Sequence, residues 1–461
     1  MLRITNSMMK NNTKNNINLN KTTADKMNTQ VATGQKISRP SDDPVIAIRA
    51  LRLNTNLSEL NQFYDKNIPD AKAWLNVTET ALSQTDGIFS SIKENLTTGA
   101  SDDNTASDRQ KILENLKAMR DQIYASGNAD YAGRTVFTGY RTGEPLIYKE
   151  DSNVSFTMTE PFTANSVEEI KYVKGTASST TTDVETISVN RLRLAYDKVD
   201  DSADVTLTID GVDTVLTAQP KSDAAYMNPP CYIAETGEII LDNDLKAAIE
   251  GADEVTVTYS RAGFEKGELK PEHYFSCIDG DGVAYNGYVG DNKSHFENQE
   301  LKVEISFEQT ITINTHADAV YTHDMGRDVD ELIVATQKVV DAEQRLSKLA
   351  ETDPDYNAAK KSLDLLKENM QKLFSLNLKK FDGYSDRTNL AIANIGSMQS
   401  RLAITRERVA DQIQSFTELA DENINIELTD SAIELKNAQL ALEAAQQASA
   451  KIAQQSLLNY L

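Results

Sequence analysis

The chain has 461 residues, and because a single compact core rarely grows to that size, two or three domains are expected. A formal net charge of −23 argues against a nucleic-acid partner and against an anionic membrane surface, since both need a clustered basic patch. No apolar run is long enough to span a bilayer, and no apolar core of a secretory signal peptide follows the basic residues near the N-terminus. We therefore expect the protein either to stay inside the cell or to leave by a route that needs no cleaved signal.

The apolar periodicity divides the chain into helical, β-rich and helical parts. The predicted fold class is α + β, with long terminal helices that form a bundle or coiled coil around a β-rich insert. The expected domains are terminal coiled-coil helices at 1–37 and 421–461, a helical bundle at 38–140 and 326–420, and the insert at 141–325.

The first helical segment is unusually polar. Seven of its first twenty residues are Asn, which is a weak helix former. Ile17, Ala24 and Val31 are nevertheless spaced by seven, with Asn20 and Met27 between them, which is a heptad seam that includes a polar residue. Because so polar a helix is not stable alone, this segment is expected to need a partner.

A turn rich in proline and aspartate follows Gly34, which is expected to end the first helix. Its residues are Ser38, Arg39, Pro40, Ser41, Asp42, Asp43 and Pro44. Asp42 or Asp43 can cap the next helix, and Pro44 suits its first position. That helix places apolar residues on one face at steps of four and three, namely Ile46, Ala50, Leu53, Leu57, Leu60 and Tyr64. Pro69 and Asp70 are expected to restart the pattern, and a shorter helix includes Ile112 to Ile123.

The middle of the chain alternates apolar and polar residues as strands do. Val205 to Ile209 lead into Asp210-Gly211, a strong hairpin turn, and the chain returns at Val215. Residues 232–234 and 239–241 predict a second hairpin, residues 255–259 a strand, and residues 303–307 with 311–313 another strand pair. The insert is expected to be one or two antiparallel β units, with a mobile loop at 178–183.

The C-terminal part is predicted to be helical, with a break at Asp353-Pro354-Asp355. No proline or glycine occurs from Ser397 to Leu461, which predicts one unbroken helix. Its heptad positions are Leu428, Leu435 and Leu442 in one row and Ala438, Ala445 and Ile452 in another, and the chain ends with Leu457, Leu458, Tyr460 and Leu461 among its last residues.

Both chain ends contain few bulky apolar side chains. Burying a leucine contributes about 1.5–3 kcal/mol and an alanine much less, whereas ordering the backbone costs about 1–2 kcal/mol per residue. We therefore expect the ends to be weakly ordered in a free monomer and to gain order by packing against other subunits. The alternative is an ordinary intramolecular coiled-coil stalk.

No catalytic pattern emerges: the sequence contains no GxxxxGK[ST] loop, no GxGxxG and no HExxH. The segment from Asp279 to Val283 resembles a calcium loop, but Val283 and Ala284 occupy positions that need an oxygen ligand and a glycine, so a β-turn is expected. Cys231 and Cys277 can pair, although buried free thiols are the favoured expectation. We predict a protein that is not an enzyme and has no cofactor or metal.

Two end motifs resemble the flagellin superfamily. The stretch from Ala32 to Ile37 followed by the Arg39–Pro44 turn resembles the N-terminal turn of that superfamily, and its Arg-Pro-Ser-Asp-Asp-Pro form is similar to that of the hook–filament junction members. The end of the chain, from Ala448 to Leu461, is similar to theirs as well. The resemblance covers about the first 140 and the last 130 residues.

The resemblance implies a structural subunit of the bacterial flagellum that joins hook to filament. It implies that the terminal helices form the inner core of an axial tube, that the next helices surround it, and that the insert faces outward. The implied partners are copies of the chain in the junction zone, the first hook-associated protein, flagellin-type subunits, and an export chaperone on the C-terminal helix. The implied location is extracellular, after type III export. The alternatives are a filament flagellin, a secreted coiled-coil adhesin that binds through the insert, and an enzyme within the insert.

Overall fold

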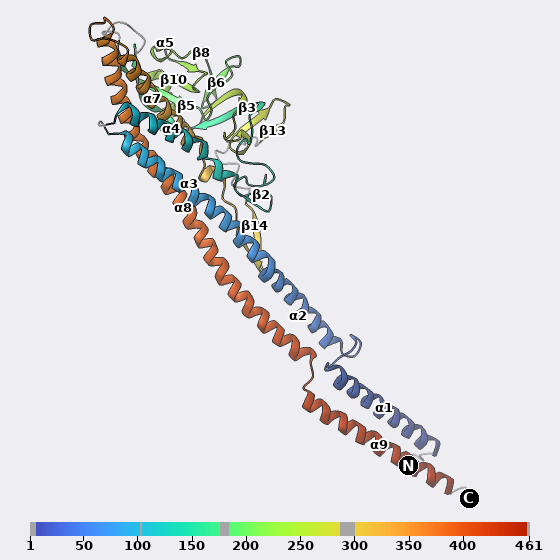
Figure 1. The fold of residues 1–461 in the computed structure, drawn as a ribbon. Coiled ribbons are helices and arrows are strands. Elements are labelled where there is room, and N and C mark those ends of the chain that lie inside the picture. The colour runs from blue at the N-terminus through green and yellow to red at the C-terminus, as the bar shows by residue number, and fades with distance from the viewer. Residues whose placement is uncertain (1–5, 102–103, 176–183, 286–299, 459–461) are drawn as a thin grey trace. The chain divides into compact units, whose positions relative to one another are not determined.

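The computed structural model describes residues 6–101, 104–175, 184–285 and 300–458, and the predicted loop at 178–183 lies outside them (Figure 1). The chain forms two compact units. The first comprises Met1–Pro69, Glu304–Thr310 and Leu402–Leu461, and the second comprises Asp70–Val303 and Ile311–Arg401. The predicted α + β class is confirmed, with helices toward both chain ends and a β-rich middle region.

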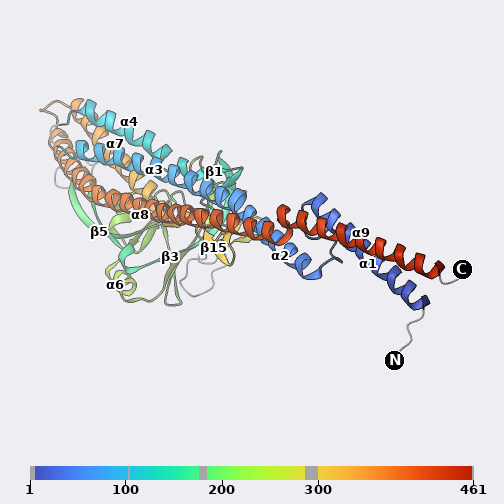
Figure 2. The same cartoon turned by 90° about the horizontal axis from the view of Figure 1, so that it is seen from below.

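The first unit is built mainly from α1 (Asn6–Thr33), α2 (Pro44–Gln62), the last part of α8 (Tyr356–Ile424) and α9 (Leu428–Leu458). Helices α1 and α9 lie side by side in both views (Figures 1 and 2). They run antiparallel, because Asn20 contacts Ala441 while Gln35 pairs with Asn425. As predicted, α1 ends before Gly34, which has a φ of +72° that glycine adopts without strain.

The sequence predicted that the helix beginning at Pro44 is interrupted at Pro69 and Asp70, but the structure shows no interruption there. Helix α2 passes through a π-helical turn, η1 (Phe63–Asn67), directly into α3 (Ile68–Gly99). In this turn the Ile68 N–H donates to the Phe63 carbonyl, and both residues keep helical dihedral angles. Pro69 has no N–H to offer, and the wider turn that precedes it adjusts the backbone without ending the helix.

The prediction of one unbroken C-terminal helix is wrong. Helix α8 ends at Ile424 and α9 begins at Leu428, although no proline or glycine separates them. The carbonyl of Ile424 accepts a hydrogen bond from the Lys36 N–H, and the Ile426 N–H donates to the Gly34 carbonyl. Backbone groups that pair with the N-terminal turn in this way cannot continue a helical ladder, so the break is caused by a contact from the other end of the sequence.

The helices of the second unit are α3, α4 (Ala106–Gln122), α7 (His323–Ser347) and the remainder of α8. Phe89 of α3 packs on Phe381 of α8 with ring centroids 5.8 Å apart, and both rings are fully buried. Arg109 of α4 forms a 2.7 Å ion pair with Glu343 of α7. The predicted short helix and the break between α7 and α8 are both confirmed.

Two sheets form most of the insert, and strand pairing within them is antiparallel except between β8 and β9. The five-stranded sheet has the order β4-β5-β10-β9-β8, with bounds Glu168–Lys174, Glu185–Arg193, Glu238–Leu241, Cys231–Ile233 and Ala218–Gln219. The six-stranded sheet has the order β13-β12-β3-β11-β6-β7, with bounds Ala284–Tyr285, Ser276–Asp279, Ser152–Phe162, Val255–Phe264, Val205–Ile209 and Val212–Leu216.

The remaining elements are small. Strands β1 (Asp130–Tyr131) and β2 (Arg134–Thr135) pair, as do β14 (Lys302–Ser306) and β15 (Gln309–Thr312). Two short helices, α5 (Asp223–Met227) and α6 (Asn243–Gly251), lie in the insert. Single turns of 3₁₀ helix occur at Ala125–Asn128, Ala164–Ser166, Pro271–His273 and Ala317–Ala319.

The two sheets share one apolar core. Met158 and Val257 of the six-stranded sheet are fully buried in the same cluster as Ile239 of the five-stranded sheet and Ile249 of α6. The predicted hairpins are confirmed, and Asp210 and Gly211 both have the positive φ that the β6–β7 turn requires. Buried cysteines lie in both sheets, and both are free thiols.

The five-stranded sheet is joined to α7 by buried ion pairs. Arg191 of β5 lies 2.7 Å from Glu331 of α7 and 2.8 Å from Glu168 of β4. Arg193 of the same strand lies 2.6 Å from Asp328, which is fully buried. Burial by itself would raise the pKa of Glu168, but the two arginines outweigh it and keep that pKa far below its usual value. These pairs fix the insert to the helices.

Candidate assembly surface

The predicted turn after Gly34 is organised by its two aspartates, each of which satisfies a different set of backbone donors. Asp43 is the N-cap of α2, and its Oδ1 accepts from the Val45 N–H at 2.9 Å and the Ile46 N–H at 3.2 Å. Asp42 instead folds back, and its Oδ2 accepts from the Arg39 N–H at 2.9 Å. Of the two expected candidates, Asp43 therefore caps the helix, whereas Asp42 stabilises the turn before it.

The turn is tied to the junction of α8 and α9. Gln35 forms an antiparallel bridge with Asn425, and the Lys36 N–H donates to the Ile424 carbonyl at 2.7 Å. The Asn423 side-chain amide donates to the Ile46 carbonyl at 3.1 Å, at the start of α2. The two ends of the sequence are thus connected at the point where both change direction.

The facing surfaces of α1 and α9 form a narrow seam. Among the described side chains of the seam, Ala24 and Ala438 are buried, and both are small. The predicted heptad residues around them are half-buried, namely Ile17, Met27 and Val31 on α1 and Leu435, Leu442 and Ala445 on α9. The polar residue on the seam, Asn20, donates from its side-chain amide to the Ala441 carbonyl at 3.3 Å. The pair therefore buries little apolar surface.

The heptad residues at the edges of the seam differ from this pattern. Leu428 is 62% exposed and does not join the seam, because it is the first residue of α9, directly after the break. Ile452, Leu457 and Leu458 belong to α9, but the structure describes only their backbone. Tyr460 and Leu461 lie outside the described residues altogether.

A second set of apolar side chains in this unit faces solvent. Val45, Ile48 and Leu51 of α2 are 59%, 55% and 69% exposed. Exposed members on the terminal helices are Met8, Met9 and Leu19 of α1 and Leu428, Ile433 and Leu440 of α9. The sequence-based prediction did not include the α2 residues, although their i, i+3 spacing beside the half-buried face was a visible signal. We call these nine residues of α1, α2 and α9 the exposed apolar set.

The charges of the terminal pair lie outside the seam. Helix α1 has four lysines and one aspartate, whereas the chain as a whole is strongly acidic.

No helix among the described residues is both long and apolar enough to cross a membrane. The described residues also contain no group of three or more His, Cys, Asp or Glu that could bind a metal ion. The Asp279–Val283 segment is a turn, as expected, in which Asp279 accepts from the Val283 N–H at 2.8 Å.

Comparison with known proteins connects the N-terminal part to flagellar proteins. Residues 4–142 match the bacterial flagellin N-terminal helical region. The chain is 29% identical over 118 residues to flagellar hook-associated protein 3 of Salmonella typhimurium, which covers 25% of this chain and 37% of that protein. It is 25% identical over 153 residues to a flagellin of Clostridium tyrobutyricum, which covers 33% and 40% respectively. The match thus spans about two fifths of each relative's length or less.

The chain is also 28% identical over 114 residues to flagellar hook-associated protein 3 of Escherichia coli, which covers 24% of this chain and 36% of that protein. Among solved structures, the flagellar junction protein of Legionella pneumophila superposes with a TM-score of 0.34 and 12% identity, covering 82% of this chain and 99% of that one. The resemblance to the flagellin superfamily is confirmed by the match at residues 4–142 and by the similarity to these relatives.

Proposed function

We propose that this chain, whose residues 4–142 match the flagellin N-terminal helical region and which is similar to flagellar hook-associated protein 3, is a non-enzymatic structural subunit that joins hook to filament in the bacterial flagellum. The observation that supports this proposal is the exposed apolar set. Among the described side chains of α1, α2 and α9, the seam buries two alanines while nine large apolar side chains face water, and such a surface is suited to packing against further helices. Assembly then removes from water the surface that the single chain leaves exposed.

In this proposal the terminal helices of neighbouring copies pack together to form an axial core. The break at residues 425–427 and the turn at 34–44 fix the direction in which α1 and α9 leave the rest of the first unit. The remaining partners would be the first hook-associated protein, flagellin-type subunits and an export chaperone that binds the C-terminal helix. The chain would reach its extracellular place by type III export.

The test is complementation of a flagellated strain that lacks its own junction subunit. We expect the full chain to restore motility, to appear in isolated hook structures, and to reduce the filament protein shed into the medium. Failure of the expressed and exported chain to enter flagella would refute the proposal.

A matched pair of variants connects the result to the exposed apolar set. Ile48→Glu places a charge among exposed apolar residues of α2 and should block incorporation without unfolding the monomer. Ser58→Glu introduces the same charge at another exposed position of the same helix and should incorporate normally. Equal incorporation of both variants would show that the apolar set is not an assembly surface.

The runner-up is a filament flagellin, which the similarity to a Clostridium tyrobutyricum flagellin supports. Assembly of the purified chain distinguishes the two: a filament flagellin should form long filaments alone, whereas a junction subunit should add only a short zone to hook ends.

A further inference from the structure

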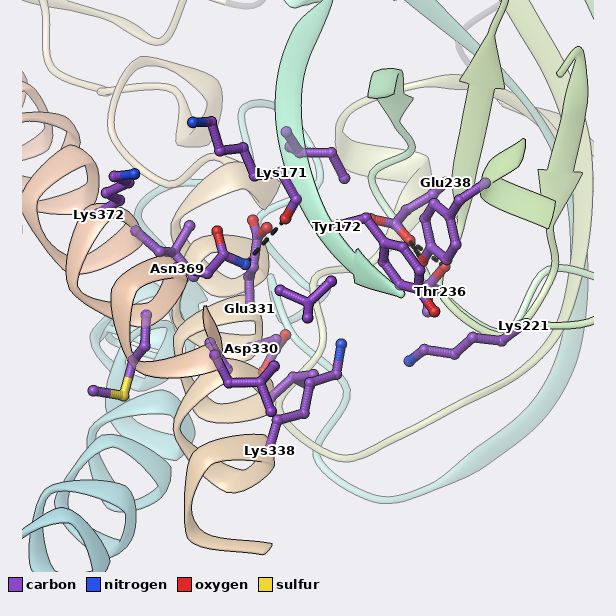
Figure 3. Close-up of a pocket in the computed structure, with 18 of the residues that line it drawn as sticks. Lys171, Tyr172, Lys221, Thr236, Glu238, Asp330, Glu331, Lys338, Asn369 and Lys372 are labelled. Carbon is purple, nitrogen blue, oxygen red and sulfur yellow. Dashed lines mark hydrogen bonds between the residues drawn. The ribbon is translucent and has the colours of Figure 1, made fainter. Parts of the chain in front are cut away.

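A cavity of about 710 Å³ lies in the second unit between the five-stranded sheet and helices α7 and α8 (Figure 3). Strand β4 forms one side and the two helices form the other. Cavities of this volume are of the size that accommodates small-molecule ligands. The proposed junction role does not use this cavity.

Part of the cavity wall is apolar and uncovered. Val334 of α7 and Leu376 of α8 are 43% and 60% exposed, although both line the cavity. Leu366 and Met370 of α8 also line the cavity and are buried, and Ile170 of β4 is another apolar residue of the lining. A ligand with an apolar body would cover this surface and gain about 25 cal/mol for each Å² removed from water.

Two stacked aromatic rings form a second part of the wall. The rings of Tyr172 and Tyr226 lie 3.9 Å apart with an interplanar angle of 18°. Their hydroxyl groups are already occupied, since Tyr172 donates to Asp223 at 2.6 Å and Tyr226 donates to Glu238 at 3.0 Å. These residues therefore offer the cavity ring surface and not a free polar group.

Lys221 and Lys338 supply positive charge at the rim of the aromatic wall. Both side chains extend toward the space beside Tyr172 (Figure 3), and Lys338 Nζ lies 5.9 Å from the centre of the Tyr172 ring. Among the described residues, neither lysine forms a hydrogen bond or ion pair. Burial, and then the neighbouring charge of Lys221, lower the pKa of Lys338.

Several other cations of the cavity already have partners. Arg191 forms ion pairs with Glu238 and Glu331, and Lys372 forms one with Glu368 of the same helix. The positive charge of Lys221 acts unfavourably on Lys338, and an acidic group placed beside both lysines would relieve that repulsion.

We propose that this cavity binds a small organic anion with one acidic group and an apolar body. The acidic group contacts Lys221 and Lys338, and the body covers Val334, Leu376 and the Tyr172 ring. Because ammonium groups and uncovered apolar side chains line the same space, the site selects amphiphilic anions over inorganic ions and over neutral apolar molecules.

Calorimetric titration of the full chain with decanoate tests this site. We expect saturable binding of one decanoate per chain, with 1-decanol and decyltrimethylammonium binding at least tenfold more weakly. Equal binding of decanol and decanoate, or the absence of saturable binding of decanoate, would overturn the proposal.

Variants locate the binding. Lys338→Met should weaken decanoate binding at least tenfold, Lys338→Arg should retain it within about threefold, and Val334→Trp should block it by filling the cavity. Lys372→Met is the matched control, because it removes a cavity cation that already has a partner, and it should bind within about twofold of the wild type. Unchanged binding by Lys338→Met would refute the assignment, and thermal unfolding of each variant identifies any that fail to fold.

Discussion

Gln35 and Asn425, which are separated by almost the whole sequence, form an antiparallel bridge that joins the N-terminal turn to the break between α8 and α9. Hydrogen bonds from Lys36 N–H to Ile424 and from Ile426 N–H to Gly34 flank it at 2.7 and 3.0 Å. The bridge sets the register of the terminal pair, because it fixes where α1 ends and where α9 begins.

Substitution of Gly34 tests the role of this bridge. Gly34 has a φ of +72°, and valine in that conformation should cost about 1–2 kcal/mol. Gly34→Val should therefore speed amide exchange in α1 and α9 and lower incorporation into flagella. Gly383→Ala, which replaces a helical glycine with open space around it, should leave both properties unchanged or slightly improved. Normal exchange in Gly34→Val would show that the bridge does not stabilise the pair.

In the free monomer, backbone amides of the terminal helices should exchange faster than those of the well-buried helix α3. The α1–α9 seam buries Ala24 and Ala438, whereas α3 buries Trp74, Leu82 and Phe89. Exchange should therefore be fast at residues 6–33 and 428–458 and slow in α3, and it should slow at the ends after assembly. Protection of the ends equal to that of α3 in dilute monomer would contradict the view that they gain their order from other subunits.

Truncation of the last six residues should separate assembly from folding of the insert. Removal of Ser456 to Leu461 deletes the last three residues of α9 and the three that follow, whereas the core shared by the two sheets is formed by other residues. We expect the truncated chain to keep the thermal transition of its insert and to fail to incorporate. A variant in which these six residues are replaced by six unrelated polar residues controls for chain length. Incorporation of either variant into flagella would contradict the prediction.

Replacement of Glu160 should stabilise the insert in mildly alkaline solution. Burial raises the pKa of Glu160 to about 8, although its Oε2 accepts hydrogen bonds from Ala195 N–H and Tyr259 OH. Since the folded state keeps a proton that the unfolded state loses above about pH 4.5, Glu160 costs stability increasingly as pH rises toward 8. Glu160→Gln should therefore raise the melting temperature more at pH 8 than at pH 5, and Glu250→Gln at an exposed site should change it equally little at both.

His323 should make the second unit less stable in acid. Burial, and then the charges of Arg327 and Arg261, lower its pKa to about 3, and its Nε2 lies 2.9 Å from Tyr196 OH. Because the unfolded state gains a proton near pH 6.5 and the folded state does not, this stability is complete above that pH and is lost as pH falls toward 3. The loss between pH 6.5 and 5 is about 2 kcal/mol.

The measurement is the slope of unfolding free energy against pH. His323→Phe should flatten the slope between pH 5 and 6.5 whatever its effect on absolute stability. Tyr274→Phe alters a neighbouring ring that does not titrate in this range and should keep the wild-type slope. An unchanged slope in His323→Phe would show that another group causes the acid sensitivity.

The sequence by itself determined the elements that depend on local patterns. Heptad spacing identified the seam residues of α1 and α9, turn residues identified the Asp43 cap and the Asp210-Gly211 hairpin, and proline identified the break before α8. These features follow from contacts between residues near each other in the chain, so periodicity and propensity are sufficient to find them.

Only the tertiary structure decided the break at residues 425–427, the exposure of Leu428 and of the α2 apolar residues, and the position of Lys338 in a cavity with Lys221. Each depends on which backbone or side-chain groups a distant segment covers or leaves open. The hydrogen bonds from Lys36 and Ile426 interrupt a helix that every local signal favours, because pairing with the remote N-terminal turn satisfies the same backbone groups as the helix would.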